Sequence, residues 1–509
     1  MMGRLKQILT GKLMFVLISI LLQLFLLISM IYRVSEIIYI NYFLSFLSYV
    51  IVIYVINSRI NMVFKLAWCV LILAFPVLGG VLYILFGGRL VPKKLRIEST
   101  LSLNETKGLV YQDEDVYKSF EEKSDYNIKK IFDYGEIVGV FPIFNNSEIT
   151  YLELGEVKWK AMLEELSKAK YFIFLEYFII KDGVMWQSIL DILKEKVKDG
   201  VEVKIIFDDF GAASTLAKDY DIELEKYGIE ALRFNRLRPA LLVQMNNRDH
   251  RKICVIDNNV AFCGGINIGD EYINVEERFG HWKDSAVMIK GEAVWGFTVM
   301  FFQIYRYLKD ETIDFEKYRI PCVPIKNDTF VQPYYDSPTD GENVGLNIHL
   351  NLINNAKKYV YIHTPYLVID ENIKYSLMLA AKSGVDVRIT TPHIPDKKYV
   401  FQITRYNYEE LIEAGVKIYE YTPGFLHSKS IVVDGEVGMC GTINMDFRSY
   451  FHHYECGVLF YNSDAVKDMY EDQMNVFEVS ELITLEKCKN VNIIVKFIRV
   501  VLNLIAPLL

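Results

Sequence analysis

The chain has 509 residues, enough for two to four domains. Hydrophobic residues make up 52% of it, which is high for a soluble protein, and the net charge of −8 argues against a general nucleic-acid binder, whose affinity would rest on a basic surface. The seven cysteines are scattered and include no CxxC pair, so they predict neither a zinc site nor a disulfide framework.

Three uncharged, strongly apolar segments lie near the start of the chain, at 13–32, 37–58 and 66–88. Each has about the 20 residues that a helix needs to cross the hydrocarbon core of a bilayer. We therefore expect residues 1–97 to form a membrane region with two or three transmembrane helices, in a multi-pass protein of the cell membrane. Pro76, Gly79 and Gly80 can bend the third segment into a re-entrant or interfacial hairpin.

Basic residues flank this membrane region on both sides. Arg4, Lys6 and Lys12 precede the first segment, and a basic cluster at 89–96 follows the third. An excess of lysine and arginine favours the cytoplasmic side of a membrane, but three full spans cannot place both ends there. We expect the large C-terminal part to be cytoplasmic, with the 89–96 cluster near anionic head groups.

After a linker at 98–135, the chain repeats itself. The sequence "KAKYFIFLEYFII" (168–180) resembles "NAKKYVYIHTPYLVI" (355–369), and further pairs follow in the same order. The succession of strand-like and helix-like runs in each copy predicts an α/β fold with largely buried strands. We expect two halves, at 136–325 and 326–480, each a mixed sheet flanked by helices, related by a pseudo-twofold axis.

The strongest part of the repeat is a polar motif. The sequence "DHRKICVIDNNVAFCGGIN" (249–267) matches "LHSKSIVVDGEVGMCGTIN" (426–444). One HxK is a weak signal, whereas two long segments that agree at five polar or glycine positions are a strong one. A second alignment, further along the chain, pairs Asp284 with Glu455. The positions matched in the motif are His250 with His427, Lys252 with Lys429, Asp257 with Asp434, Gly264 with Gly441 and Asn267 with Asn444.

The histidine and lysine of each motif lie two residues apart, so they point to the same face of a strand. If the halves pack about the axis, two histidines and two lysines come together. The lysines would neutralise the non-bridging oxygens of a phosphate, and Asn267 and Asn444 would add hydrogen-bond donors. One histidine, if neutral, can attack phosphorus, while the other, if protonated, can donate to the leaving oxygen.

The carboxylates of the repeat have two different expected places. Asp284 and Glu455 are candidates for a carboxylate behind each histidine ring, where it would fix the tautomer and stabilise the imidazolium. Asp257 and Asp434 lie on the opposite face and roughly 16 Å further along the strand. We expect these two first as turn or buried ion-pair residues, and only second as catalytic ones.

Glu176 and His363 occupy equivalent positions in the two copies. Each either lines the cleft or is a satisfied polar residue of the core. No metal-ligand spacing is present in the sequence, so we expect neither a metal nor a cofactor.

The HxKxxxxD motif followed by GG or GT and x-N, present twice, resembles the phospholipase D superfamily, and residues 136–480 fit it throughout. Residues 65–88 resemble the membrane segment of bacterial cardiolipin synthases. This resemblance implies transfer of a phosphatidyl group between two phosphatidylglycerol molecules, through a phosphohistidine, to give cardiolipin and glycerol. It implies membrane lipid as the partner, and the net charge of −8 argues against nucleic acid. The implied catalytic residues are His250, Lys252, Asp257, His427, Lys429 and Asp434, with His250 as nucleophile by analogy.

Two features depart from the family pattern: the extra apolar segment at 13–32 and the sequence "HHYE" at 452–455. The amphipathic tail at 481–509 is either an interfacial helix or a segment packed on the domain. The same site residues would serve a membrane-bound phospholipase D hydrolase or another phosphatidyltransferase. The acidic balance weighs against a nuclease, and two complete motifs weigh against a non-catalytic lipid-binding scaffold.

Overall fold

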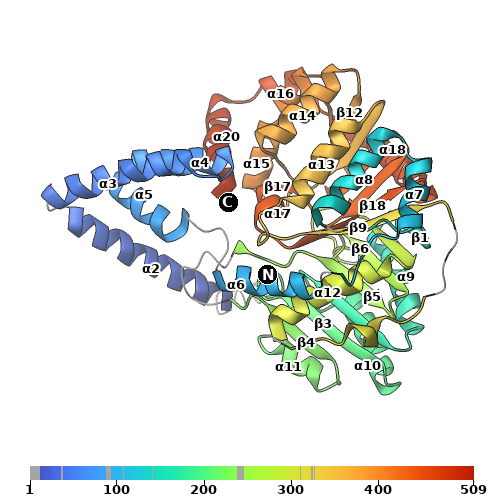
Figure 1. The fold of residues 1–509 in the computed structure, drawn as a ribbon. Helices are drawn as coiled ribbons and strands as arrows, with labels where there is room; N and C mark the ends of the chain where they lie inside the picture. The colour runs from blue at the N-terminus through green and yellow to red at the C-terminus, as the bar shows by residue number, and fades with distance from the viewer. Residues whose placement is uncertain are drawn as a thin grey trace.

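The computed structural model describes residues 12–35, 38–87, 93–106, 108–139, 141–237, 246–309, 311–322, 325 and 327–508. Within these ranges the protein has two α/β halves, each with its own large sheet, and a group of N-terminal helices that projects away from them (Figure 1).

The first half is built on a seven-stranded sheet with the order β1-β8-β6-β5-β2-β3-β4. The central strand β2 is parallel to β3 and antiparallel to β5. Every residue of β2 and β5 is buried, which explains why both are nearly continuous apolar runs. The elements are β1 (Ser147–Leu152), α9 (Gly155–Ser167), β2 (Phe172–Tyr177), α10 (Val184–Lys198), β3 (Glu202–Asp208), α11 (Tyr220–Glu225), β4 (Glu230–Phe234), β5 (Lys252–Ile256), β6 (Val260–Gly264), β7 (His281–Lys283), β8 (Ala286–Gly291), α12 (Val294–Lys309) and the short 3₁₀-helix η3 (Phe315–Tyr318).

The second half repeats this plan with the strand order β9-β18-β16-β15-β10-β12-β13, and β19 is added beyond β13. Its central strand β10 is parallel to β12 and antiparallel to β15, as β2 is to β3 and β5. The prediction of two mixed α/β halves is confirmed. The elements are β9 (Phe330–Asp336), α13 (Val344–Asn355), β10 (Tyr359–His363), β11 (Leu367–Val368), α14 (Glu371–Lys382), β12 (Asp386–Pro392), α15 (Lys398–Tyr406), α16 (Tyr408–Glu413), β13 (Lys417–Tyr421), β14 (Gly424–Leu426), β15 (Ser430–Val433), β16 (Val437–Gly441), β17 (Met445–Asp446), α17 (Phe447–Phe451), β18 (Glu455–Tyr461), α18 (Asp464–Glu478) and β19 (Ser480–Leu482).

The two halves are joined by a shared core, by an antiparallel bridge between Phe144 and Val331, and by two backbone connections close to the motifs. Strand β7 of the first half pairs in parallel with β14 of the second, and Asp249 forms a single parallel bridge with Tyr454. These connections immediately precede His427 and His250, so they fix where each motif enters the interface. The shared core contains Cys263, Val287, Val432, Cys440, Cys456 and Val458.

The segment predicted as a linker, 98–135, is largely helical and packed. Helix α6 lies against α12 of the first half, and α8 lies against α13 of the second. Phe120 and Phe132 on α7 and α8 are fully buried in the core of the second half. This segment therefore ties the N-terminal helices to both halves. Its elements are α6 (Lys93–Thr106), α7 (Glu114–Lys123) and α8 (Tyr126–Gly139).

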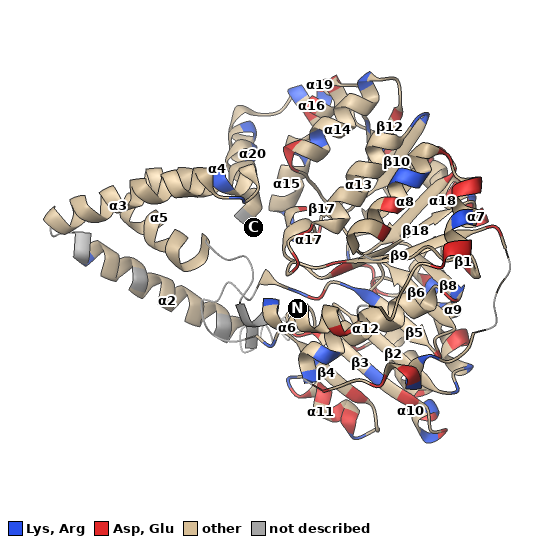
Figure 2. Ribbon diagram, in the orientation of Figure 1, with Lys and Arg blue, Asp and Glu red and all other residues tan. Residues whose placement is uncertain are grey.

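The N-terminal helices confirm the predicted membrane region only in part. Helix α3 is the one helix in the described ranges that is long and apolar enough to cross a membrane, and neither it nor α5 carries a charged residue (Figure 2). The predicted segment 13–32 lies within α2, some of whose side chains fall outside the described residues. The elements are α2 (Lys12–Ser35), α3 (Ile38–Asn57), α4 (Met62–Ala74), α5 (Pro76–Leu82) and the π-helical turn η1 (Tyr83–Gly87).

The third predicted segment, 66–88, is not a single helix. Its helical hydrogen bonding breaks at Phe75, because Pro76 has no amide hydrogen and its ring would clash with the preceding turn. The helices on the two sides of Pro76, α4 and α5, pack closely against each other. A Cβ added at Gly79 of α5 would lie 2.6 Å from the Cα of Ile72 in α4. The third segment is therefore two short helices instead of one long helix, and its bend at Pro76 agrees with the bend considered from the sequence.

Helix α4 anchors the N-terminal helices to the second half. Asn61, which caps α4, donates a hydrogen bond from Nδ2 to the Asp370 carboxylate at 3.1 Å. The ring of Phe64 is 3% exposed and lies edge-on to two phenylalanines of α17 and to His452, with ring centroids 5.4–5.9 Å apart. The N-terminal helices and the second half thus share an aromatic contact.

The C-terminal tail packs on the protein with one face and leaves the other exposed. In α20, Arg499 donates to Gln402 at 2.9 Å, and Leu502 and Ala506 join the cluster around Phe64. Helix α20 lies next to α4, as Figure 1 shows, and its free face is apolar, so this face suits a membrane interface. The exposed residues include Ile493, Ile494, Phe497, Val500 and Val501. The tail elements are α19 (Leu485–Lys489), α20 (Ile493–Ile505) and η4 (Ala506–Leu508).

Candidate active site

Each HxK motif enters its sheet from a short extended segment that is bonded to the other half. The His250 amide donates to the Tyr454 carbonyl at 2.9 Å, and the His427 amide donates to the Lys283 carbonyl at 2.6 Å. The two histidines are therefore held at the interface between the halves, just before β5 and β15 begin.

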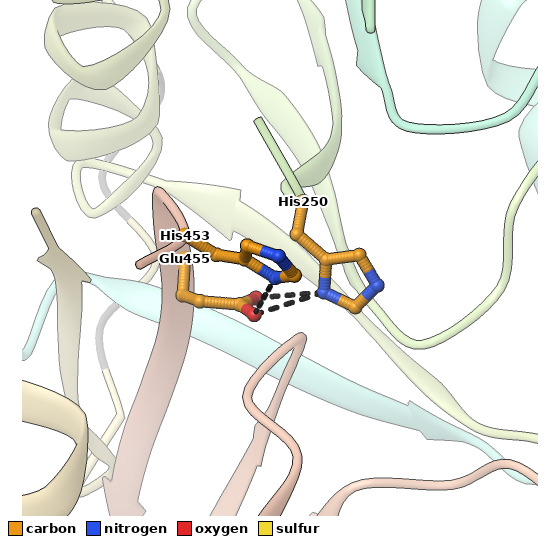
Figure 3. A group of neighbouring side chains, drawn as sticks. All are labelled: His250, His453 and Glu455. Carbon is orange, nitrogen blue, oxygen red and sulfur yellow. Dashed lines mark hydrogen bonds and ion pairs between the residues drawn. The ribbon is translucent and has the colours of Figure 1, made fainter. Parts of the chain in front are cut away.

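Each histidine ring meets a carboxylate from the opposite half. His250 Nδ1 lies 2.9 and 3.0 Å from the two carboxylate oxygens of Glu455, and His427 Nδ1 lies 2.6 Å from Oδ2 of Asp284. Figure 3 shows the first of these pairs. A carboxylate only accepts, so each ring carries its proton on Nδ1 and leaves Nε2 with a free lone pair. The exchange is reciprocal, as a twofold relation between the halves requires.

Burial sets the electrostatics of the two histidines. It lowers the pKa of His250 to about 4 against the opposing effect of Glu455, and it lowers the pKa of His427 to about 4 with a further contribution from Lys429. The pKa of Glu455 is lowered because the nearby His250 and His453 outweigh the effect of burial. Without an anion in the site, both rings are neutral near pH 7.

The two lysines belong to the same cluster. Lys252 Nζ donates to the carbonyl of His250, and Lys429 Nζ donates to the carbonyl of His427. Burial lowers the pKa of Lys252 to about 8 and that of Lys429 to about 7. Each lysine also acts electrostatically on the histidine of the other half, which places all four groups around one centre.

The two motif asparagines are tied to the backbone and to neighbouring loops. Asn267 accepts from the Ile179 amide at 3.0 Å and donates to the Tyr272 hydroxyl at 2.8 Å, so both ends of its side-chain amide are engaged. Asn444 is buried, and its amide oxygen has no hydrogen-bond partner within the described part of the chain. Of the two, Asn444 is the one whose side chain remains available to a ligand.

The structure places the motif aspartates at the far end of the strands, where they cap neighbouring backbone. Asp257 accepts from the three amides of residues 170–172 at 2.7–2.8 Å, and Asp434 accepts from those of residues 357–359 at 2.7–2.8 Å. Both have left-handed backbone, with φ of 52° and 55°. This placement agrees with the turn role that the sequence predicts first. Among the described residues, neither aspartate contacts His250 or His427, as the catalytic role would require.

Replacing Asp257 with asparagine tests this placement. Asparagine tolerates the left-handed backbone, so the substitution removes the charge and weakens three charge-assisted hydrogen bonds without straining the turn. We expect a loss of about 1–3 kcal/mol of stability, measured by denaturant unfolding, with kcat per folded molecule nearly unchanged. A fall in kcat of a hundredfold or more, with stability retained, would instead make Asp257 catalytic.

Glu176 and His363 are buried side chains of the central strands β2 and β10. Glu176 is 3.7 Å from Arg251, and burial together with Asp249 raises its pKa well above the usual range. His363 packs beside Phe477, and burial lowers its pKa. Neither is a satisfied core residue, because both Glu176 carboxylate oxygens and both His363 nitrogens lack a hydrogen-bond partner in the described ranges.

Aromatic side chains around the histidines were not anticipated. The ring of His427 lies 5.5–5.7 Å from those of Trp282, Phe425 and Tyr272, and the ring of His250 lies 5.1 Å from that of Phe178. A signal was present in the sequence, since Trp282 precedes Asp284 by two residues and Phe425 precedes His427 by two. In a strand, that spacing puts both members of a pair on one face.

His453, to which the sequence gives no role, also lies at the site. Its Nδ1 lies 3.6 Å from Oε1 of Glu455, and its ring centroid lies 5.4 Å from that of His250 (Figure 3). Burial lowers its pKa to about 4. Two histidines therefore share one carboxylate on this side of the site, whereas the Asp284 side has His427 alone among the described residues.

Comparison with solved structures places the fold. The crystal structure of phosphatidylserine synthase from Haemophilus influenzae Rd KW20 matches with a TM-score of 0.56 and 17% sequence identity, covering 75% of this chain and all of that one. At this identity the likeness concerns the fold. The fold and the histidine–carboxylate pairs that cross between the halves define a duplicated α/β protein with one site between its two halves.

Sequence comparison narrows the class. The profile of the family described as cardiolipin synthase, PLD-like domain, matches residues 162–293 and 349–475, and the phospholipase D-nuclease N-terminal profile matches residues 44–88. The cardiolipin synthase of Alkalihalophilus pseudofirmus is 36% identical over 87% of this chain and 88% of its own length. An uncharacterized protein of Streptococcus mutans is 42% identical over 90% and 99%. The chain belongs to the cardiolipin synthase family.

Proposed function

We propose that the protein is a phosphatidyltransferase that joins two phosphatidylglycerol molecules into cardiolipin and releases glycerol. The observation that carries this proposal is the reciprocal pair of histidine–carboxylate contacts, His250 with Glu455 and His427 with Asp284, set among two lysines in one buried cluster. Family membership supports the lipid substrate. The same arrangement of two acid–base histidines is what a double displacement at phosphorus needs.

In the first displacement, His250 Nε2 attacks the phosphorus of one phosphatidylglycerol, and the bond from phosphorus to the glycerol oxygen breaks. His427, protonated when the anionic substrate is bound, gives its proton to that oxygen, and glycerol leaves. Glu455 stabilises the charge that develops on the His250 ring. The product of this step is a phosphatidyl group bound to His250.

In the second displacement, the terminal hydroxyl of a second phosphatidylglycerol attacks the same phosphorus. His427, now neutral, removes the hydroxyl proton, and the bond from phosphorus to His250 breaks. Asp284 holds the His427 ring and stabilises it each time it carries two protons. Lys252 and Lys429 balance the charge on the non-bridging oxygens through both steps.

The lysines determine the alkaline side of the pH profile. An ammonium group binds phosphate only below its pKa, and burial lowers those of Lys429 to about 7 and Lys252 to about 8. We therefore expect kcat/KM to fall as pH rises through this range. In Lys429→Arg the charge persists at all these pH values, so the decline should move up towards the value set by Lys252.

The measurement is the initial rate at low substrate concentration between about pH 6 and pH 9. These limits lie roughly one pH unit below the pKa of Lys429 and one above that of Lys252. Lys290→Arg, at a partly exposed lysine of the first half, is the matched control. An alkaline limb that stays in place in Lys429→Arg would show that another group sets it.

Product analysis tests the proposed reaction. Purified full-length protein is incubated with vesicles containing phosphatidylglycerol labelled in its head group, and the lipid and water-soluble products are separated. Cardiolipin and labelled glycerol in equal amounts are expected. Phosphatidic acid without cardiolipin would show the hydrolase instead, and a mixed product with an added alcohol but no cardiolipin would show a different transferase.

We propose that the catalytic halves lie on the cytoplasmic side of the cell membrane. The basic residues beyond the third apolar segment, the apolar helix α3 and the exposed face of α20 support this arrangement. A membrane-impermeant thiol reagent applied to cells carrying Val110→Cys, with Cys69 and Cys322 replaced by serine, tests it. We expect labelling only after the membrane is opened, and labelling of intact cells would reverse the orientation.

A further inference from the structure

We propose that His250, His453 and Glu455 form a binding site for Zn²⁺, and that the bound ion inhibits the enzyme. The three side chains converge from both halves of the protein, as Figure 3 shows. Their donor atoms all lie within 4.8 Å of one another. The inhibitory effect rests on the catalytic role proposed for His250, whereas the binding site itself does not.

The distances between the donor atoms suit a zinc ion with small adjustments. Two ligands that are each about 2.1 Å from a tetrahedral zinc lie roughly 3.4 Å apart. His250 Nδ1 is 2.9 Å from the nearer Glu455 oxygen, and His453 Nδ1 is 3.6 Å from Glu455 Oε1. Two imidazoles and one carboxylate are also a ligand set that zinc takes in proteins, with a fourth position left to water or substrate.

The surroundings of His453 favour binding of a ligand by its ring. Its side chain is 10% exposed, and neither ring nitrogen has a hydrogen-bond partner in the described part of the chain. A buried imidazole that approaches a carboxylate only at 3.6 Å is poorly satisfied, and coordination by a metal would satisfy it. The nearby Lys252 and Lys429 repel a cation, so we expect binding at micromolar zinc concentrations instead of the tight binding of a structural site.

The ion would inhibit by changing the tautomer of His250. In the metal-free site the proton on Nδ1 faces Glu455 and the lone pair is on Nε2. Coordination uses an Nδ1 lone pair, so the ring proton moves to Nε2 and the ring remains neutral overall. Nε2 then has no lone pair with which to attack phosphorus, and Glu455 no longer serves the imidazolium.

A second group of possible ligands provides an internal control. His393, Glu420 and Glu481 also approach one another. However, Arg405 makes two hydrogen bonds to Glu420 at 2.7–2.8 Å, and Lys487 bonds both oxygens of Glu481 at 2.7 Å. These cations already neutralise the carboxylates, so this second group is a poor site for a divalent ion.

The test is a Zn²⁺ titration of the full-length protein in detergent, freed of metal with a chelator, followed by calorimetry without lipid. We expect one ion per chain for the wild type and for His393→Asn, and a loss of affinity of about 10- to 100-fold in His453→Asn. Co²⁺ in place of zinc should give the visible absorption of a four-coordinate ion in the wild type and not in His453→Asn.

The kinetic part of the test uses the cardiolipin assay with and without Zn²⁺. Inhibition of the wild type should be reversed by chelator, and His453→Asn should need at least about tenfold more zinc for half-inhibition. Unchanged affinity in His453→Asn, or affinity lost in His393→Asn, would overturn the site. Zinc binding that needs His453 but leaves the rate unchanged would overturn the inhibition, and absence of cardiolipin without zinc would count against the proposed reaction alone.

Discussion

Replacing either His250 or His427 with alanine should reduce cardiolipin formation by at least about a thousandfold. The two residues act in the same double displacement, so neither can replace the other, and the double variant should lose little more than each single one. Both side chains lie between the two halves and are 7–8% exposed. Each substitution therefore leaves a small cavity next to the site and does not disrupt the hydrophobic core.

The measurement is the single-turnover rate on labelled phosphatidylglycerol, with thermal unfolding as the check on folding. His393→Ala, at a partly exposed histidine of the second half, is the matched control and should keep near wild-type activity. The two single variants should differ in one respect: covalently bound lipid can form on the protein only where His250 remains. Substantial turnover by either variant, or covalent label on His250→Ala, would contradict the assignment.

Replacing the carboxylates should show how the histidine pairs work. In Glu455→Gln and Asp284→Asn the shape is kept, but an amide cannot stabilise the imidazolium, and its NH₂ group can turn the ring to the wrong tautomer. We expect kcat to fall by about 10²- to 10⁴-fold in each variant, with KM changed far less because both carboxylates are fully buried beside the histidine rings.

Asp257→Asn is the matched control for these variants, since it removes a motif carboxylate that binds only backbone amides. The carboxylate hypothesis predicts a clear contrast in kcat between Asp257→Asn and the other two. Equal losses in all three, after correction for the folded fraction, would mean that the carboxylates act through stability alone.

The fold and the centre of the site were predictable because they repeat. The motif recurs with the same spacing, and a duplicated sequence makes a duplicated sheet, so the matching strand orders followed from the alignment. The same alignment paired Asp284 with Glu455, and the structure places each beside the histidine of the opposite half. No single copy of the motif would have carried that information.

Other features depend on packing that no local pattern records. The stretch 98–135 is rich in charge, yet Phe120 and Phe132 are fully buried, because β9, β18 and α13 offer them apolar surfaces from distant parts of the chain. The direction of the His453 ring depends on the turn that follows α17, whose amides bond back to Arg448. A pair of adjacent histidines does not show which ring will face the carboxylate.

The contact of Phe64 with His452 has a consequence for producing the protein. Cutting away the N-terminal helices to obtain a water-soluble fragment would remove Phe64 and open an aromatic pocket formed by α17 and His452. His453, which shares the Glu455 carboxylate with His250, is the next residue along. We therefore expect the active site to be disturbed in a fragment that begins after α4. A fragment intended for structural work should keep the chain from Asn61 onward.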